Sequence, residues 1–378
     1  MCPLSDKIMK IAIDIRSAEK EKTGKGWYTF NIVKELLKLD RENQYFLYTA
    51  HKDKPFDSRQ NVEYVCIDSS PSKWHFKVLK DLNQKEVDVF FAPSSYIIPA
   101  FASKKLKVVL TIHDLVAFLF PSNHQTRAVI IERLTLKQAI KKAAHVITVS
   151  ENTKKDIIEK FTYPNEKITV AKCSASKTFL KPIPEKDLHD FKNKMKLPDK
   201  FILGVSTIEP RKNFPNLIKS FVLIKKRHPD YKLVIAGKKG WKTKEVDKAL
   251  KEFNLHDDVI FTGYIKENDL SKLYRLADVF VFPSLYEGFG IPPLEAMSAG
   301  CPVVASNISA MPEVIGEAGL IVDPKNAYKL SDAISSIIEN EHVREMLIER
   351  GLRQVEKFSW TDSAQKILNI FMQLKNEN

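Results

Sequence analysis

Two glutamates, Glu287 and Glu295, are the residues of this chain whose types and spacing most clearly indicate chemistry. The apolar run before them, residues 278–282, predicts a buried strand, and Pro292–Pro293 presets the first turn of a helix ending at Gly300. A strand thus enters a helix through a loop with glycines at 288 and 290, where backbone N–H groups and the helix dipole favour a phosphate. We place Glu295 in the first helical turn. This context predicts a sugar-nucleotide site, where a bare pair of acids would indicate only surface charge.

A second polar segment follows the predicted strand 201–205 and contains Glu209-Pro-Arg211-Lys212-Asn213. Ligands of open α/β sheets bind outside the carboxyl ends of strands, so Arg211 and Lys212 would project where two phosphates need neutralising. The alternative is a solvated pair of cations. Because cations are disfavoured at a helix start, their placement points to an anionic ligand.

Two predicted strand ends in the first half carry further candidates. His113 and Asp114 follow the strand 107–112, and the histidine could be a general base, a hydrogen-bond donor to a sugar hydroxyl or a buried packing residue. Arg16 follows the strand 10–15, and Gly24 and Gly26 precede a helix that runs to residue 38. These glycines admit phosphate or sugar, or form a plain turn, and they make neither a Walker loop nor a full dinucleotide fingerprint.

The glutamate pair resembles the Glu-x7-Glu signature of glycosyltransferase family 4, a family of retaining enzymes. The segment Glu-Pro-Arg-Lys-Asn is similar to the form found in mannosyltransferase-like, group 1 members. The resemblance covers essentially the whole chain and is densest from residue 206 to 319. It implies that Glu287 contacts hydroxyls of the donor sugar and that Glu295 holds the ribose. It also implies that Arg211 and Lys212 grip the donor diphosphate, and that His113 lies near the reacting carbon and the 6-hydroxyl.

The same resemblance assigns two further groups of residues. Those on the donor side are Gly24, Gly26, Tyr264, Ile265, Gly288, Phe289, Gly290 and Ile291, and those on the acceptor side are Arg16 and Asp114. Tyr264, in the segment whose backbone receives the donor base, either stacks or packs. The chain departs from the family at Lys25 and Trp27, where relatives often have Ile and Arg, and at 173–176, where Cys-Ser-Ala-Ser replaces a Gly-Val/Ile-Asp segment.

Alternating strands and helices must position these residues. Predicted strands near 10–15, 44–49, 87–92, 107–112 and 145–149, and a second series near 201, 231, 257, 278, 302 and 319, indicate two parallel sheets. We expect a Rossmann-like acceptor-side domain at 1–173 and a nucleotide-sugar-binding domain at 174–360. Together with the resemblance, this predicts two facing, doubly wound α/β domains with a cleft between them, the GT-B fold. The resemblance implies that the C-terminal helix, 361–378, packs back on the first domain.

Composition limits the compartment and the partners. Four cysteines without paired or metal-like spacing, no apolar run of membrane-spanning length and no signal-peptide core predict a cytoplasmic protein. The charge of +13 is concentrated in the first half. A basic amphipathic helix over 126–143 either packs on the core or makes weak contact with an anionic membrane, at the inner face of the cell membrane. No basic aromatic strand pattern or zinc finger indicates nucleic-acid binding.

We therefore expect a retaining enzyme that moves a hexose, most plausibly mannose from GDP-mannose, to a hydroxyl of a growing lipid-linked or polysaccharide glycan. No Asp-x-Asp triplet occurs, so we expect no cofactor and no essential divalent metal. Alternatives are a sugar-nucleotide epimerase of the same fold and a noncatalytic glycan- or nucleotide-binding protein. A dinucleotide oxidoreductase lacks its glycine fingerprint. The donor nucleotide, the acceptor, the linkage and the oligomeric state do not follow from the sequence.

Overall fold

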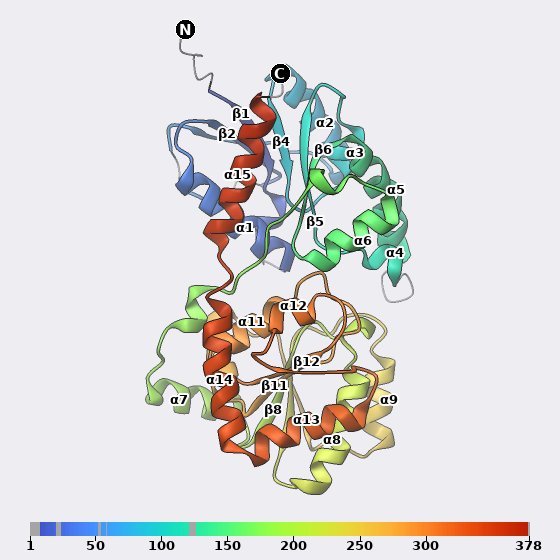
Figure 1. Cartoon of the computed structure of the whole chain (residues 1–378), viewed down its shortest axis with the longest axis vertical. Coiled ribbons are helices and arrows are strands. Elements are labelled where there is room, and N and C mark those ends of the chain that lie inside the picture. Colours follow the sequence, from blue (N-terminus) through green and yellow to red (C-terminus); the bar gives the residue numbers. More distant parts are fainter. Residues whose placement is uncertain (1–7, 20–23, 52–53, 58, 121–125, 377–378) are drawn as a thin grey trace. The chain divides into compact units, whose positions relative to one another are not determined.

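The computed structural model describes residues 8–19, 24–51, 54–57, 59–120 and 126–376. The chain forms two compact units, one from residues 1–173 together with 359–378 and one from residues 174–358 (Figure 1). Each unit is built on one parallel sheet, as the alternation of strands and helices predicted. No helix among the described residues is both long and apolar enough to cross a membrane.

The first unit contains a seven-stranded parallel sheet in the order β3-β2-β1-β4-β5-β6-β7. Its strands are β1 (Lys10–Asp14), β2 (Gln44–Thr49), β3 (Val62–Cys66), β4 (Val89–Ala92), β5 (Lys107–Ile112), β6 (Ala143–Thr148) and β7 (Ile168–Val170). The two edge strands, β3 and β7, were not predicted from the sequence. The β7 strand is only three residues long, and β3 is the half-exposed run Val-Glu-Tyr-Val-Cys, so neither gives the buried apolar run by which a strand is recognised.

Helices cover both faces of this sheet. They are α1 (Gly24–Leu39), α2 (Pro71–Gln84), α3 (Ile97–Phe101), α4 (Val116–Leu119), α5 (Thr126–Lys142), α6 (Glu151–Phe161) and α15 (Trp360–Asn376). Buried side chains of α2, α3, α5 and α6 share one apolar core with the sheet. The C-terminal helix α15, red in Figure 1, runs beside α1 and begins where the Ser359 hydroxyl accepts from the Asp362 N–H at 3.1 Å.

The second unit contains a six-stranded parallel sheet in the order β10-β9-β8-β11-β12-β13. Its strands are β8 (Phe201–Val205), β9 (Lys232–Ala236), β10 (Val259–Gly263), β11 (Val279–Phe282), β12 (Val303–Ser306) and β13 (Leu320–Val322). Its helices are α7 (Glu185–Met195), α8 (Phe214–Arg227), α9 (Lys244–Glu252), α10 (Glu267–Leu276), α11 (Ile291–Ser298), α12 (Met311–Ile315), α13 (Ala327–Glu339) and α14 (Glu341–Val355). One apolar core joins α8, α9 and α13 to the sheet, because these strands are almost entirely Val, Ile, Leu and Phe.

Candidate functional site

Each sheet reverses its winding direction at one point, between β1 and β4 in the first unit and between β8 and β11 in the second. Such a switch point opens a crevice at the carboxyl ends of the strands, because the two flanking loops run in opposite directions. In the second unit the loop after β8 carries Arg211 and Lys212, and the loop after β11 carries Glu287. Three of the residues singled out in the sequence therefore meet at this switch point.

These three side chains form a compact ion cluster. One oxygen of Glu287, Oε2, lies 2.7 Å from Arg211 Nη1, and the other, Oε1, lies 2.5 Å from Lys212 Nζ. The three side chains are only 10 to 16% exposed. The solvated-pair interpretation of Arg211 and Lys212 is therefore wrong, since both cations hold the carboxylate of a loop some 75 positions further along the chain.

Further contacts fix the two loops against each other. Glu209 binds the far side of the Arg211 guanidinium at 2.6 Å, and Arg211 also donates to the Tyr286 carbonyl at 2.7 Å. Asn213 adopts a left-handed conformation, with φ of +59°, and its amide donates to the Pro283 and Pro324 carbonyls. The Ser309 hydroxyl accepts from the Glu287 N–H at 2.8 Å. The cluster is thus held rigidly before any ligand arrives.

The neighbouring cations keep the Glu287 carboxylate ionised. Burial alone would raise the pKa of Glu287, but the neighbouring Arg211 and Lys212 charges outweigh it and lower the pKa to about 2. The pKa of Lys212 falls below its usual value because burial and Arg211 together outweigh the attraction of Glu287. Near neutral pH the Glu287 carboxylate is therefore ionised.

The glycine loop after Glu287 leads directly into α11. Gly290 has φ of +102°, a left-handed conformation, and a Cβ there would collide with the Met311 methyl group. The Phe289 ring is buried against Phe358, with ring centroids 5.7 Å apart, so the side chain anchors the loop. Gly288 precedes it, and α11 begins at Ile291, whose N–H has no partner within the helix. Pro292 and Pro293 follow and carry no N–H.

Glu295 occupies a different setting from Glu287. It lies in the second turn of α11, not the first as predicted, because the helix begins at Ile291. The Tyr274 hydroxyl donates to its Oε2 at 3.1 Å. Burial raises the pKa of Glu295 to about 7, against the lowering effect of the Tyr274 hydrogen bond. The two glutamates of the pair thus have opposite pKa shifts.

Tyr264 and Ile265 follow β10, the edge strand of the same sheet. Tyr264 is 51% exposed, and Lys238 Nζ lies 4.9 Å from the centre of its ring. The ring is therefore not buried in the core, and it stays available for stacking. An exposed aromatic ring beside a cation is suited to stacking on a flat, electron-rich group.

In the first unit, His113 follows β5 and is buried. Its Nε2 lies 2.7 Å from the Pro93 carbonyl, and its ring meets the Tyr28 ring edge-on at 4.7 Å. Burial, with the Lys25 charge, lowers the pKa of His113 to about 4 although Asp114 and the Pro93 contact oppose the shift. The ring is therefore neutral at pH 7, and donation from Nε2 to the carbonyl leaves Nδ1 as a hydrogen-bond acceptor.

Arg16 lies at the switch point of the first sheet, just after β1. Its guanidinium forms a two-point pair with Asp14, at 2.9 and 2.7 Å, and stacks on Trp74 at 3.6 Å from the ring centre. His75, next to Trp74, has its pKa lowered to about 4 by burial and by the Arg16 charge. Its Nδ1 is buried without a hydrogen-bond partner among the described residues.

The remaining predicted residues of the first unit are Gly24, Gly26 and Asp114, and they lie in or beside helices. Gly24 and Gly26 lie within α1 and not before it, so they do not form the predicted loop. Asp114 accepts from the Val116 N–H at 3.1 Å, which forms a local turn just before α4. Thr23, next to these glycines, lies outside the described residues.

The sequence did not reveal several neighbours of the candidate residues, namely Glu209, Tyr274, Ser309, Trp74 and His75. Only Glu209, inside the Glu-Pro-Arg-Lys-Asn segment, carried a local signal; the others come from elements distant in sequence. Among the described residues, no group of three or more His, Cys, Asp and Glu side chains is arranged to hold a metal ion.

Comparisons with known proteins agree with this arrangement. Residues 23–174 match the family described as Glycosyltransferase Family 4, and residues 185–354 match Glycosyl transferases group 1. The chain is 32% identical over 309 residues to O-antigen chain mannosyltransferase B of Escherichia coli, a match that covers 82% of this chain and 78% of that protein. It is 30% identical to the serotype-specific mannosyltransferase WbdA of Escherichia coli over 71% of this chain, although that match spans only 34% of WbdA.

Among solved structures, Alr3699/HepE of Anabaena in complex with UDP and glucose superimposes with a TM-score of 0.78. The likeness covers 97% of this chain and 100% of that one, at 19% sequence identity. Two parallel-sheet Rossmann-like units and this likeness confirm the predicted two-domain α/β, GT-B fold.

Proposed function

Because this chain belongs to the family 4, group 1 glycosyltransferases, we propose that it transfers mannose from GDP-mannose to a hydroxyl of a growing glycan, with retention of configuration. The glycan is lipid-linked or a polysaccharide. Two relatives carry the name mannosyltransferase, one of them for the O-antigen chain, and these names support the choice of sugar and of acceptor class. The observation that carries the proposal is the buried cluster of Glu287, Arg211 and Lys212 at the switch point of the second sheet.

The cluster suits a donor that has both a diphosphate and hydroxyl groups. Arg211 and Lys212 are the partners that a diphosphate requires, and Glu287 is an acceptor for sugar hydroxyls. In the structure the two sets of groups satisfy each other. A nucleotide sugar would replace these contacts with its own, the cations taking the phosphates and the carboxylate taking the sugar. Their charge then stabilises the negative charge that develops on the leaving diphosphate.

The other residues would complete the donor site and the chemistry. Glu295 accepts from the ribose hydroxyls, Tyr264 stacks on the base, and the backbone at 288–291 faces the phosphates. Neutral His113 accepts a hydrogen bond from a sugar hydroxyl through Nδ1. The leaving phosphate takes the acceptor proton on the same face of the sugar as it departs, so the reaction needs no protein nucleophile. Arg211, Lys212 and the start of α11 supply the stabilisation that a metal would otherwise give, and catalysis persists without one.

The test is transfer with GDP-mannose, UDP-glucose, UDP-N-acetylglucosamine and ADP-glucose over a panel of lipid-linked glycans, in the presence of EDTA. We expect mannose transfer from GDP-mannose, with an α-linkage in the product by NMR, and loss of transfer in Arg211→Ala. Isomerised sugar without any acceptor would instead identify an epimerase. Nucleotide-sugar binding without turnover on any acceptor would indicate a binding protein.

A specific surface supports weak contact with an anionic membrane, at its cytoplasmic face. On α5, Leu136 and Ile140 are buried in the core, whereas Ile130, Ile131 and Leu134 are 54, 44 and 68% exposed. One face of the helix thus packs on the core, and another face exposes apolar side chains. Exposed Phe76 and Phe101 lie 6.2 Å apart on α2 and α3, which pack in series with α5. Lysines at 137, 141 and 142 on α5 are also exposed. Apolar and basic side chains in this combination favour an anionic interface.

Sedimentation with vesicles tests this contact. We expect binding to phosphatidylcholine vesicles that contain phosphatidylglycerol, weaker binding to phosphatidylcholine alone, and a loss of at least about tenfold in Leu134→Ser because a buried leucine contributes roughly 1.5–3 kcal/mol. Leu352→Ser, at an exposed leucine of the second unit, is the matched control. Equal binding of both variants would rule out this surface.

A further inference from the structure

Two neighbouring hollows lie on the first unit. The smaller, about 300 Å³, is bounded by α1, residues 55–57 and Arg59, and the larger, about 720 Å³, opens at the amino edge of β1, β2 and β3. Arg59 lines both, so the two share a wall. Their volumes are in the range of ligand pockets, and their succession suits an elongated ligand.

The smaller hollow begins with aromatic rings. Phe30 stacks on Phe56, with centroids 5.4 Å apart and planes 21° from parallel, and Trp27 meets Phe30 edge-on at 6.0 Å. Trp27 and Phe30 lie three positions apart on α1 and therefore share one face of the helix. This row of rings starts near the amino end of α1, which follows the switch point where Arg16 lies. Lys34, whose Nζ is 5.9 Å from the Phe30 ring, and Lys38 continue the same face.

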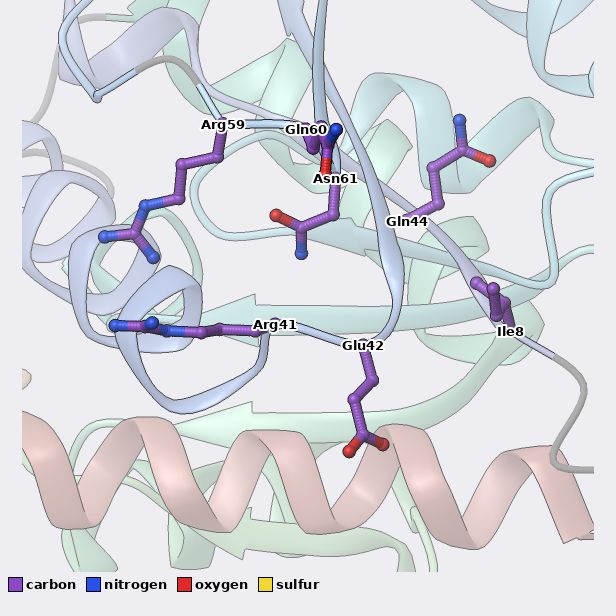
Figure 2. A pocket seen from close by; sticks show the side chains of 7 residues that line it. All are labelled: Ile8, Arg41, Glu42, Gln44, Arg59, Gln60 and Asn61. Atoms are coloured by element: carbon purple, nitrogen blue, oxygen red, sulfur yellow. The ribbon is translucent and has the colours of Figure 1, made fainter.

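The larger hollow is lined by amides and by charges of both signs. Figure 2 shows Arg41 and Arg59 extending to one side of it, whereas Gln44 lies toward the opposite end. Asn61, Gln60 and Glu42 complete its polar lining. Planar amides, guanidinium groups and a carboxylate offer donors and acceptors in fixed directions.

Both hollows have rigid walls. The Tyr64 hydroxyl binds the N–H and the carbonyl of Phe56 at 2.9 and 2.8 Å, and Arg59 donates to the Leu37 carbonyl at the end of α1. Buried Asp40 accepts from the Glu42 and Asn43 N–H groups and from the Tyr45 hydroxyl, which fixes the turn that carries Arg41. Pre-ordered walls reduce the entropy lost when a ligand binds.

We propose that this groove binds the part of the acceptor glycan that lies behind its reacting end. Phe56 is buried against Phe30, so the partly exposed Phe30 and Trp27 are the rings that would pack against the C–H faces of pyranose rings. Amides and charged groups would bind the ring hydroxyls, so the lining matches a chain of hexoses better than a single compact anion. A glycan held along α1 would extend toward the carboxyl edge of the sheet, because α1 begins at that edge, after β1. This inference rests on the proposed transfer to a growing glycan and adds a second, chain-length-sensitive contact to it.

The first measurement is binding of an α-linked mannohexaose and of mannobiose without donor, by calorimetry. The proposal predicts tighter binding of the hexasaccharide, and weakening of about five- to tenfold in the double variant Arg41→Ala/Gln60→Ala, since each lost hydrogen bond costs up to tenfold. Arg41→Lys, which keeps the charge, should weaken binding less. Lys160→Ala, at an exposed position on α6, is the control and should bind as the wild type does.

The second measurement is the ratio of KM values for long and short acceptors. In the double variant this ratio should change by the same five- to tenfold, and the products should be shorter. If transfer fails with every donor while mannohexaose still binds in the groove, the proposed reaction is wrong and the glycan groove remains. If inorganic pyrophosphate binds there and mannohexaose does not, the groove is an anion site and this inference is overturned. Equal binding of hexasaccharide and disaccharide would also overturn it.

Discussion

The two switch points of this protein are built from opposite kinds of contact. At the second, Glu287 joins Arg211 and Lys212 across two loops distant in sequence, and its carboxylate is ionised near neutral pH. At the first, Arg16 pairs with Asp14 only two residues away and stacks on a ring, and the nearby His75 is neutral. The same sheet topology therefore holds two chemically different edges.

The difference lies in which contacts a ligand can replace. The long-range pairs of the second edge can be exchanged for a diphosphate and sugar hydroxyls, because a ligand with both groups satisfies both sides. The local, two-point pair of the first edge is complete in itself, and neutral imidazoles favour uncharged hydroxyls over phosphates. We propose that the second edge binds the charged part of the donor and that the first edge binds uncharged sugar hydroxyls, those of the acceptor included, and four changes test this division.

The largest effect is expected from Arg211→Ala. Removing the guanidinium takes away one of the two cations proposed to stabilise the leaving diphosphate, and a loss of about 10³-fold in kcat is typical for one preorganised electrostatic contact. Steady-state kinetics with a thermal melt would measure it, since the change also breaks a buried ion pair. Arg227→Ala, which removes an exposed pair with Asp332, is the matched control. Unchanged kcat in a folded Arg211→Ala protein would contradict the division.

Glu287→Gln tests separately how the cluster binds the diphosphate and how it binds the sugar. The amide cannot neutralise Arg211 and Lys212, so pyrophosphate should bind at least as tightly as in the wild type, while kcat/KM falls about 10²-fold because the sugar is held less well. Calorimetry and initial rates give the two numbers. Loss of pyrophosphate affinity in parallel with activity would show that the carboxylate does not compete with the phosphates.

The pH dependence of donor binding tests Glu295. Its pKa of about 7 means that the carboxylate is mostly protonated at pH 6 and mostly ionised at pH 8. Only the ionised form accepts from both ribose hydroxyls, so GDP-mannose should bind about tenfold more tightly at pH 8 than at pH 6. Glu295→Gln should remove this dependence. A pH dependence that persists in Glu295→Gln would assign it to another group.

The same pKa has a consequence for stability. Because the folded-state pKa of Glu295 lies above its ordinary value of 4.5, its contribution to the free energy of unfolding is fully present below about pH 4.5 and is lost as the pH rises through 7. Glu287 acts in the opposite sense, since its pKa of about 2 gives stability above pH 4.5 that is lost as the pH falls toward 2.

The sequence predicted the strands and residue types of the second edge well. Buried strands there are continuous apolar runs, and the glycines, prolines and charges that follow them are local signals. The long-range contacts could not be predicted, because the pairing of Glu287 with Lys212 depends on β8 and β11 becoming neighbours. For the same reason the sequence alone allows three roles for His113. In the structure the Pro93 carbonyl occupies Nε2 and the Tyr28 ring packs against the imidazole, which leaves Nδ1 as the nitrogen that can accept from a ligand.

The smallest effect is expected at the first edge, from Arg16→Lys. Lysine keeps the charge beside Asp14 but loses the planar stack on Trp74 and the two-point pair. The loss of both contacts should weaken acceptor binding a few-fold. We expect KM for the acceptor to rise about three- to fivefold, with KM for GDP-mannose unaffected because the donor is held by the other edge. Initial rates with each substrate varied in turn would show this. Equal changes in the two KM values would mean that Arg16 serves the donor as well, and the division between a charged donor edge and a neutral acceptor edge would fail.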